Sequence, residues 1–277
     1  MIKRSLKKKV GKAPAKKAIA LPTRKTKPLE GIQNYAIYVY GKAGIGKTSF
    51  SSMFPNSLHI FYEPSGDALE LYSVEPKTWD ELEQYVELLE EQKEAGTLKF
   101  ETVVIDVVDL CYKSCIEHIC KPMDCDWPPQ DYGKTWTRIK DTFRALMYRI
   151  KRITGLVLIS HAVERDIERL DGMSYSTLVP TISGSGNDVI TKFCGVQGFY
   201  TMDNRGKRIL VIEPNNTSEV KNRIKNHFLY TDGSKILEIP MGKSEEESWK
   251  FFIQAFENKL KKPNIKTKTK NLRLKRS

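Results

Sequence analysis

Short apolar runs recur between residues 35 and 213, each rich in β-branched or aromatic residues, and stretches with helical spacing separate the first four runs. Runs of this length and composition are typical of buried strands. Strands that alternate with helices form a mainly parallel sheet with helices on both faces. The pattern therefore predicts an α/β fold, with strands at residues 35–40, 58–62, 100–106, 156–160, 196–201 and 208–213.

Three helices are expected where apolar residues return every three or four positions. One begins after Thr78, which forms a capping box with Glu81, a second covers residues 134–152, and a third begins at the box of Ser244 and Glu247. After residue 195 the strands follow one another closely, so the sheet is expected to end in antiparallel pairs. The expected buried helix positions are Leu82, Tyr85, Val86, Leu89, Trp136, Ile139, Phe143, Leu146, Ile150, Trp249, Phe252, Ile253 and Phe256.

The net charge of +12 is concentrated at the two ends of the 277-residue chain. Residues 1–28 contain eleven Lys or Arg and residues 259–277 contain nine, neither segment has an acidic residue, and the middle is net negative. Such tails are expected to be disordered and to bind a polyanion. The length suits one core with extensions. The expected organisation is a disordered basic arm (1–28), an α/β core (29–240), a C-terminal amphipathic helix (241–260) and a basic tail (261–277).

The chain has no run of 18 apolar residues, and its basic start leads to an apolar stretch too short for a secretory signal. With five cysteines and no such signal, we expect a soluble cytoplasmic protein with free thiols and no membrane partner. A mitochondrial transit peptide is disfavoured, because Lys outnumbers Arg and because Pro14 and Pro22 interrupt a helix. A nuclear signal stays open for a eukaryotic host.

A phosphate-binding loop is the most specific feature of the chain. Residues 41–48 match the pattern G-x-x-x-x-G-K-[ST] directly after an expected strand and before a helix. Its backbone N–H groups would face the β-phosphate, Lys47 would reach the β/γ oxygens, and the Thr48 hydroxyl would ligate Mg²⁺. ATP and Mg²⁺ are the expected ligands. The expected nucleotide-binding residues are Gly41, Lys42, Ala43, Gly44, Ile45, Gly46, Lys47, Thr48 and Ser49.

An acid for the magnesium site is expected at the end of a neighbouring buried strand. The run from Thr102 to Ile105 ends on Asp106, about sixty residues after the loop, which makes Asp106 the Walker B candidate beside Thr48. Asp109 is a second choice of ligand, and its alternative is a place at the start of the next helix.

The position of the carboxylate that activates water differs between the classes of P-loop enzyme. AAA+ enzymes place Glu directly after the Walker B Asp, but Val107 stands there, which disfavours that class. RecA-like enzymes place a Glu at the end of the strand that follows the loop helix, where this chain has Glu63. Glu63 is therefore the candidate for polarising the attacking water, with an ordinary loop acid as the alternative.

The order of these motifs resembles the RecA/Rad51-like ATPases, and in particular compact phage-encoded members proposed as single-strand annealing recombinases. The resemblance implies that the core at 29–240 is a RecA-like ATPase core. The resemblance covers residues 35 to about 230 and includes the strand end at His161 and the sequence Lys221-Asn222-Arg223. It implies that His161 senses the γ-phosphate, the alternative being a surface histidine. It also implies that Lys221 and Arg223 enter a neighbour's nucleotide site, as in RadA-like ATPases, the alternative being a solvated charge pair. Such an arginine finger, which acts on the nucleotide of a neighbouring subunit (in trans), requires a head-to-tail ring or filament.

The resemblance implies a phage-encoded, DNA-dependent ATPase that binds single-stranded DNA in recombination, annealing or repair, in the host cytoplasm, with a single-strand-binding protein as a further possible partner. The alternatives are a replication or packaging motor and a nucleotide-switched DNA-binding scaffold with little turnover. Without a separate helicase or primase domain, pairing or annealing is favoured over processive unwinding. A nucleotide kinase is disfavoured, because no arginine-rich lid follows the loop. Oligomer number and strand preference stay open.

Two segments are expected to contact DNA, because aromatic residues interleaved with cations suit base stacking beside phosphate neutralisation. The first is 121–136 and the second is 162–187, whose run Ser183-Gly184-Ser185-Gly186 predicts a mobile segment. Four cysteines and a histidine fall close together but match no common zinc spacing, so buried thiols are favoured over a metal site. They are Cys111, Cys115, His118, Cys120 and Cys125.

Overall fold

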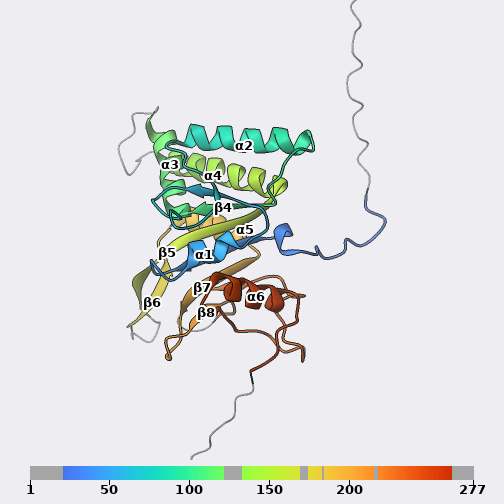
Figure 1. The fold of residues 1–277 in the computed structure, drawn as a ribbon. Coiled ribbons are helices and arrows are strands. Elements are labelled where there is room, and N and C mark those ends of the chain that lie inside the picture. Colours follow the sequence, from blue (N-terminus) through green and yellow to red (C-terminus); the bar gives the residue numbers. More distant parts are fainter. Residues whose placement is uncertain (1–20, 122–132, 169–173, 183, 215–217, 264–277) are drawn as a thin grey trace, which may run out of the picture.

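The computed structural model describes residues 21–121, 133–168, 174–182, 184–214 and 218–263. A ten-stranded sheet runs through this part of the chain between two layers of helices (Figure 1). The strand order is β10-β8-β7-β1-β5-β4-β2-β3, with β6 paired to β5 and β9 to β7. The strands are β1 Ala36–Gly41, β2 Ser57–Phe61, β3 Tyr72–Val74, β4 Thr102–Asp106, β5 Gly155–Glu168, β6 Ser174–Pro180, β7 Val196–Met202, β8 Arg208–Val211, β9 Lys221–Asn222 and β10 Glu238–Pro240.

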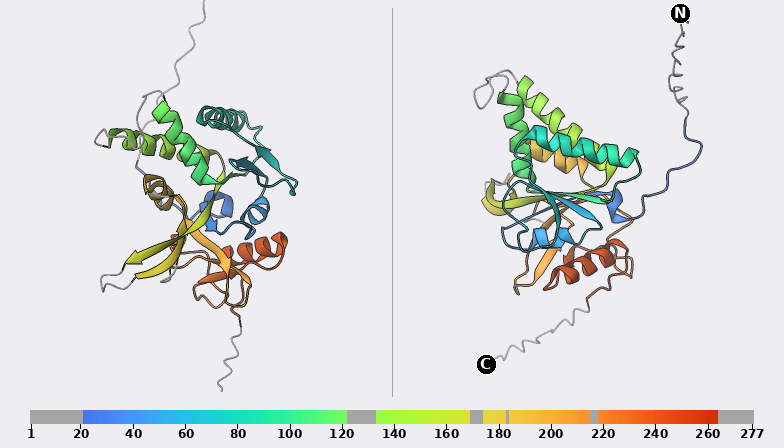
Figure 2. Two further views of the ribbon diagram at one scale, coloured as in Figure 1. Left: turned by 90° about the vertical axis from the view of Figure 1, so that its left-hand side faces the viewer. Right: turned by 45° about the horizontal axis from the view of Figure 1, so that its top comes forward.

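The central strands, from β3 to β7 in this order, pair in parallel, and β8 and β10 close the edge in antiparallel pairing. The mainly parallel sheet and its antiparallel end confirm the predicted fold class. Helices α2 to α5 cover one face, and α1 and α6 cover the other (Figures 1 and 2). The helices are η1 Ile32–Asn34, α1 Lys47–Ser52, α2 Trp79–Glu94, α3 Val108–Cys120, α4 Lys134–Ile153, α5 Gly184–Phe193 and α6 Glu245–Phe256.

Strand β1 lies in the middle of the core, and all six of its residues are buried. Tyr38 and Tyr40 pack under α2 to α5, whereas Ile37 and Val39 pack under α1 and α6. A strand buried on both faces needs apolar residues at every position, which is why the run is continuous and not alternating. The strand that leads into the phosphate loop is thus held from both sides.

The predicted helix caps are confirmed. The Thr78 hydroxyl accepts from the backbone N–H of Glu81, and Ser244 accepts in the same way from Glu247. These bonds satisfy free N–H groups at the starts of α2 and α6, where acidic residues also complement the helix dipole. Most predicted helix-face residues are buried, but Tyr85, Trp136, Trp249 and Ile253 are only partly covered.

The second segment expected to contact DNA, 162–187, consists mostly of strand and helix in its described part and is not the expected loop. Strand β5 continues beyond the sheet and forms a long hairpin with β6, from Ala162 opposite Pro180 to Glu168 opposite Ser174 (Figure 2, left). Residues 184–186 of the glycine-serine run form the start of helix α5, and the expected mobility of the run stays a prediction. Gly186 lets this helix approach α3 closely, since a Cβ there would lie 2.7 Å from the Tyr112 ring.

The basic tails lie largely outside the described residues. The described part of the N-terminal arm, residues 21–28, is exposed and contains no helix or strand. Disorder of residues 1–20 and 264–277, and the predicted domain limits, stay predictions.

A pH-dependent stability follows from His59, which is fully buried in β2 with no hydrogen-bond partner for either ring nitrogen among the described residues. Burial lowers the pKa of His59 from 6.5 to about 4. Because the unfolded chain then binds the proton more readily, stability is complete above pH 6.5 and falls as the pH drops toward 4. We expect a loss on the order of 2 kcal/mol between pH 7.5 and pH 5 from this residue.

Urea unfolding of the wild type and of His59→Phe at both pH values measures this contribution. The difference between the two proteins isolates His59 from the acidic groups, and His118→Gln, at a partly exposed histidine, is the matched control. Equal pH dependence of His59→Phe and wild type would contradict the prediction.

Candidate nucleotide-binding site

The register of four parallel strands brings the predicted site residues to one edge of the sheet. Gly41 at the end of β1 lies opposite His161 of β5. Asp106 at the end of β4 lies opposite Ile159 of β5 and Phe61 of β2. Glu63 comes two residues after the end of β2, so residues from β1, β2, β4 and β5 meet there, although β5 continues past His161 and the predicted strand end at His161 is not found. Ligand sites in open α/β sheets lie at this carboxyl edge.

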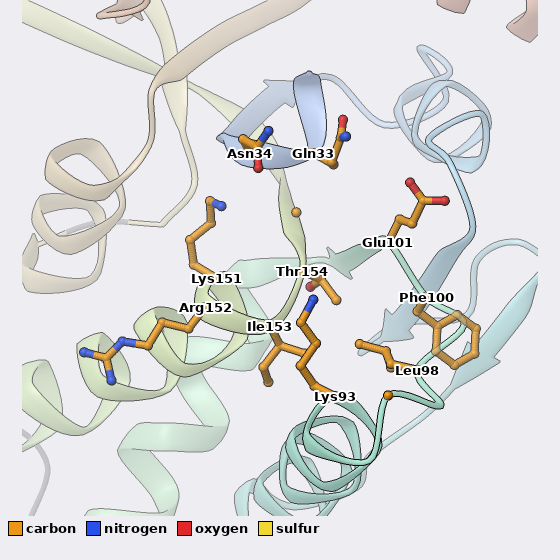
Figure 3. A pocket seen from close by; sticks show the side chains of 12 residues that line it. Gln33, Asn34, Lys93, Leu98, Phe100, Glu101, Lys151, Arg152, Ile153 and Thr154 are labelled. Atoms are coloured by element: carbon orange, nitrogen blue, oxygen red, sulfur yellow. The ribbon is translucent and has the colours of Figure 1, made fainter. Parts of the chain in front are cut away.

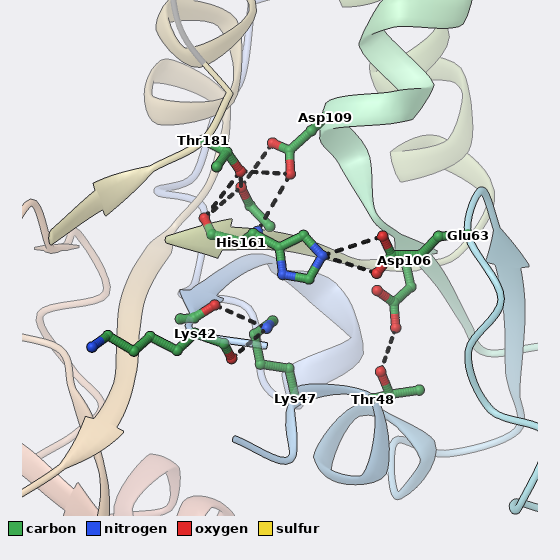
Figure 4. Close-up of polar contacts among 10 residues, drawn as sticks. Lys42, Lys47, Thr48, Glu63, Asp106, Asp109, His161 and Thr181 are labelled. Atoms are coloured by element: carbon green, nitrogen blue, oxygen red, sulfur yellow. Dashed lines mark hydrogen bonds and ion pairs between the residues drawn. The ribbon is translucent and has the colours of Figure 1, made fainter. Parts of the chain in front are cut away.

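The phosphate loop joins β1 to the start of α1. Gly44 and Gly46 have φ values of 73° and 106°, which side-chain-bearing residues rarely adopt. Gly41 needs the absence of a side chain for a second reason, since a Cβ there would collide with the backbone oxygen of Tyr200. The Lys47 ammonium donates to the backbone oxygens of Gly41 and Lys42, at 2.9 and 3.0 Å (Figure 4). The lysine is therefore folded over the concave side of its own loop.

Lys47 is buried, and burial lowers the pKa of its ammonium, against the opposing effect of nearby Asp106, Glu63 and Asp109. A cation in this position gains from an anionic ligand, which would compensate its lost hydration. This is the behaviour expected of a phosphate-binding lysine.

The predicted magnesium residues form a direct pair. The Thr48 hydroxyl donates to Asp106 Oδ2 at 2.7 Å, across 58 residues of sequence (Figure 4). Asp106 is 2% exposed, and burial raises its pKa although the Thr48 hydrogen bond lowers it. A buried carboxylate beside a hydroxyl at the mouth of a phosphate loop fits Mg²⁺, which prefers oxygen ligands and keeps phosphate oxygens in its shell.

The predicted water-activating acid and the predicted sensor contact each other. His161 Nε2 lies 2.9 Å from Glu63 Oε1 and 3.2 Å from Oε2, and both side chains are 31% exposed (Figure 4). The pair is thus open to solvent while it faces the Asp106 side of the loop. The contact holds the Glu63 carboxylate in place, because an imidazole that reaches both oxygens restricts its rotation.

Asp109 connects the strand ends behind this pair. Its carboxylate accepts from the hydroxyls of Ser160 and Thr181, at 2.8 and 2.9 Å, and from the backbone N–H of His161. Burial raises the pKa of Asp109, and these hydrogen bonds oppose the rise. Asp109 lies in the first turn of α3, as the alternative interpretation expected. Its bonds orient the backbone that carries His161.

Lys221 and Arg223 are not at this edge. Strand β9 pairs with the start of β7, at the opposite edge of the sheet. The Lys221 ammonium donates to the backbone oxygen of Thr191 and the Arg223 guanidinium to that of Lys192, both in the last turn of α5. Cations at a helix C-terminus bind its free carbonyls and complement its dipole. Within one chain they therefore cap α5.

A hollow of about 500 Å³ also lies at this opposite edge (Figure 3). Its lining includes Gln33, Asn34, Lys93 and Lys151, and none of the predicted nucleotide residues. This hollow is therefore separate from the phosphate loop.

Sequence reasoning missed two residues beside the loop, Arg208 and Tyr200. A Cβ at Gly46 would lie 3.0 Å from Arg208 Nη1 and 3.7 Å from the Tyr200 hydroxyl. No sequence pattern marks either residue, since Arg208 follows a turn and Tyr200 belongs to an apolar strand.

The cysteines of α3 are packing residues in the described structure. Cys111 and Cys115 are buried free thiols in the core under the helices, and burial raises the pKa of Cys111 to about 12. His118 instead pairs with Asp80 of α2 at 3.1 Å. The described residues contain no group of three His, Cys, Asp or Glu arranged for a metal. Cys125 and most of the first predicted DNA segment, 122–132, lie outside the described residues.

The fold and site together define a P-loop nucleotide-binding domain. A family model described as an AAA domain matches residues 33–224, and the chain belongs to this family. The match indicates nucleotide-dependent ATPase activity and covers every predicted catalytic residue. No curated protein matches the chain. The match identifies a P-loop ATPase domain but does not by itself identify it as RecA-like. In the part of the chain that the structure describes, no helix is long and apolar enough to cross a membrane.

Removal of the Asp106 charge tests the magnesium site. We expect Mg²⁺ to strengthen ATP binding by the wild type and to lose this effect in Asp106→Asn, because the amide carries no charge for the cation. A lost charged ligand corresponds to roughly a tenfold change in affinity or more. Titration with a fluorescent ATP analogue, with Mg²⁺ and with chelator, measures it. Thr48→Ser, which keeps the hydroxyl, is the control, and a full Mg²⁺ effect in Asp106→Asn would exclude this site.

Proposed function

We propose that this protein is a Mg²⁺-dependent, RecA-like ATPase that binds single-stranded DNA in recombination, annealing or repair. The observation that carries the ATPase assignment is the Glu63–His161 pair, which lies beside the Thr48–Asp106 pair at the mouth of the phosphate loop. A phosphate loop alone binds nucleotide, whereas hydrolysis also needs a base that can orient water near the γ-phosphate. Glu63 supplies this group, and its position after β2 is the RecA-like one.

The chemistry assigns a separate task to each residue. Lys47 leaves the loop carbonyls and binds the β- and γ-phosphate oxygens, and the loop N–H groups hold the β-phosphate. Thr48 and Asp106 would hold Mg²⁺, which would supply charge neutralisation to the phosphates. The Glu63 carboxylate orients a water molecule and takes its proton as the water attacks the γ-phosphorus, while the β–γ bridging oxygen leaves with ADP. His161 restrains Glu63 and, in this proposal, senses the γ-phosphate.

A neighbouring subunit supplies the missing cation in this proposal. Lys221 and Arg223 lie at the opposite sheet edge from the loop, so they cannot serve the nucleotide of their own chain. A head-to-tail assembly would bring this edge of one copy to the acidic edge of the next. The oligomer would be a ring or filament, and Lys221 and Arg223 would neutralise the charge that develops on the γ-phosphate.

The DNA part of the proposal rests on the charge distribution and on the motif order. All basic excess lies in the two tails, whereas the middle of the chain is net negative. Lys-rich tails bind a phosphate backbone without sequence preference. A phage origin, a place in the host cytoplasm and a single-strand-binding protein as partner belong to the same proposal. A motor or a scaffold with negligible turnover would share the loop and the tails.

The ATPase rate with and without single-stranded DNA tests this function. We expect turnover that DNA stimulates, and its loss in Lys47→Ala, because the lysine neutralises phosphate charge. Glu63→Gln should keep ATP binding and lose hydrolysis, since only water activation is removed. Lys93→Ala, at a cation outside the site, is the matched control.

Unchanged turnover in Lys47→Ala would refute the ATPase assignment. Loss of ATP binding in Glu63→Gln would make Glu63 a structural residue. ATP binding without measurable turnover, at any DNA concentration, would favour the scaffold.

Mixed subunits test the finger in trans. Arg223→Ala and Lys47→Ala should each be inactive, and their mixture should recover a part of the wild-type rate, because some interfaces then pair an intact loop with an intact finger. The rate is measured across mixing ratios at constant total protein. A rate that stays at the sum of the two single variants would place the role of Arg223 within its own subunit.

A further inference from the structure

The phosphate loop has two flanks of different chemistry. Strand β1 lies between β5 and β7 in the sheet. On the β5 side are His161 and, one strand further, Asp106. On the β7 side, Tyr200 lies opposite Gly41, and Arg208 lies at the start of β8, opposite Met202 of β7. The catalytic acids and Arg208 therefore approach the loop from opposite directions.

Arg208 is held against the loop at Gly46. Its Nη2 donates to the backbone oxygen of Lys243, just before α6, and its Nη1 lies 3.0 Å from the Cβ position of Gly46. Among the described residues, no carboxylate forms an ion pair with this guanidinium. Gly46 is favoured by its positive φ, and a side chain there would also press on the guanidinium.

Tyr200 adds an independent observation. Its side chain is 1% exposed, and its hydroxyl is buried without a hydrogen-bond partner among the described residues. This hydroxyl lies 3.7 Å from the same Cβ position of Gly46. A buried donor without an acceptor is unfavourable. The two donors that meet at Gly46 both suit an anionic oxygen.

Arg208 is also accessible to a ligand. The residue is partly exposed. Together with Lys243 it lines a groove of about 890 Å³ between the β7–β8 turn and α6, which none of residues 41–49 lines. A ligand on the loop would therefore meet Arg208 from the Gly46 side, through the N–H groups that do not bind Lys243. An arginine gives planar, charge-assisted hydrogen bonds to phosphate oxygens.

We propose that Arg208 is a further nucleotide-binding residue, which binds an α- or β-phosphate oxygen of ATP in cis, with the Tyr200 hydroxyl behind it. The γ-phosphate must face Glu63 across the loop, so a cation on the β7 side meets the phosphates nearer the nucleoside. This inference rests on the proposed function, since it assumes that the loop binds ATP. It adds to the site a second cation that comes from the same chain, unlike Arg223.

Nucleotide affinity of Arg208 variants tests the inference. Arg208→Gln keeps a donor for the backbone oxygen of Lys243 and removes the charge, and Arg208→Lys restores a charge. Arg205→Gln changes an exposed arginine in the turn just before β8. We expect Arg208→Gln to weaken the binding of ATP and of ADP by the same factor, about 10- to 100-fold. Arg208→Lys should recover a part of the loss, and Arg205→Gln should match wild type. Equilibrium titration with fluorescent ATP and ADP, beside the Tm of each nucleotide-free protein, gives the readouts.

The outcomes separate this inference from the ATPase assignment. If wild type binds neither nucleotide, the proposed function fails. If wild type binds both nucleotides, and Arg208→Gln binds them with the same affinity as Arg205→Gln, only the role of Arg208 is refuted. A loss confined to ATP would also refute it, because that would place Arg208 at the γ-phosphate. A loss accompanied by a lower Tm and not recovered by Arg208→Lys would make the residue structural.

Discussion

The position of β1 between β5 and β7 is the constraint on which the rest of this structure depends. Because β1 is buried on both faces, its last residue, Gly41, is fixed relative to both neighbouring strands. One neighbour, β5, brings His161 level with Gly41 and carries β4 beyond it, with Asp106 at its end. The other neighbour, β7, brings Tyr200 against Gly41 so closely that no side chain fits there. The loop therefore has a defined acidic flank and a defined basic flank.

Burial gives this edge its electrostatic character. Two charged side chains of this cluster, Lys47 and Asp106, are buried, and Asp109 is partly buried. Burial shifts the pKa of each group in the direction that favours its neutral form. Hydrogen bonds and opposite charges within the cluster oppose these shifts. A cluster of this kind is best stabilised when a ligand supplies both anionic oxygens and a cation. A nucleotide with Mg²⁺ has that composition.

The two edges of the sheet carry different residues. Glu63, Asp106 and Asp109 lie at the carboxyl edge together with Lys47, whereas Lys221 and Arg223 lie at the amino-terminal edge. The head-to-tail assembly proposed above would bring these two edges together. The α5 carbonyls that now bind Lys221 and Arg223 would compete with a neighbour's phosphates, so assembly and nucleotide binding would be coupled.

The sequence by itself determined the phosphate loop, the buried strands and the capped helices, because each depends on residues close in the chain. The loop residues Gly46, Lys47 and Thr48 belong to one short motif that follows a strand. The helix cap joins Thr78 to Glu81, only three residues further along the chain. Asp106 follows from the sequence in the same way, since its strand is a continuous apolar run.

Only the tertiary structure decided that Glu63 and His161, 98 residues apart, form a pair, that Arg208 lies at Gly46, and that residues 162–168 pair with residues 174–180. These features depend on strand order and register, which are set by packing over the whole sheet and leave no local pattern in the sequence.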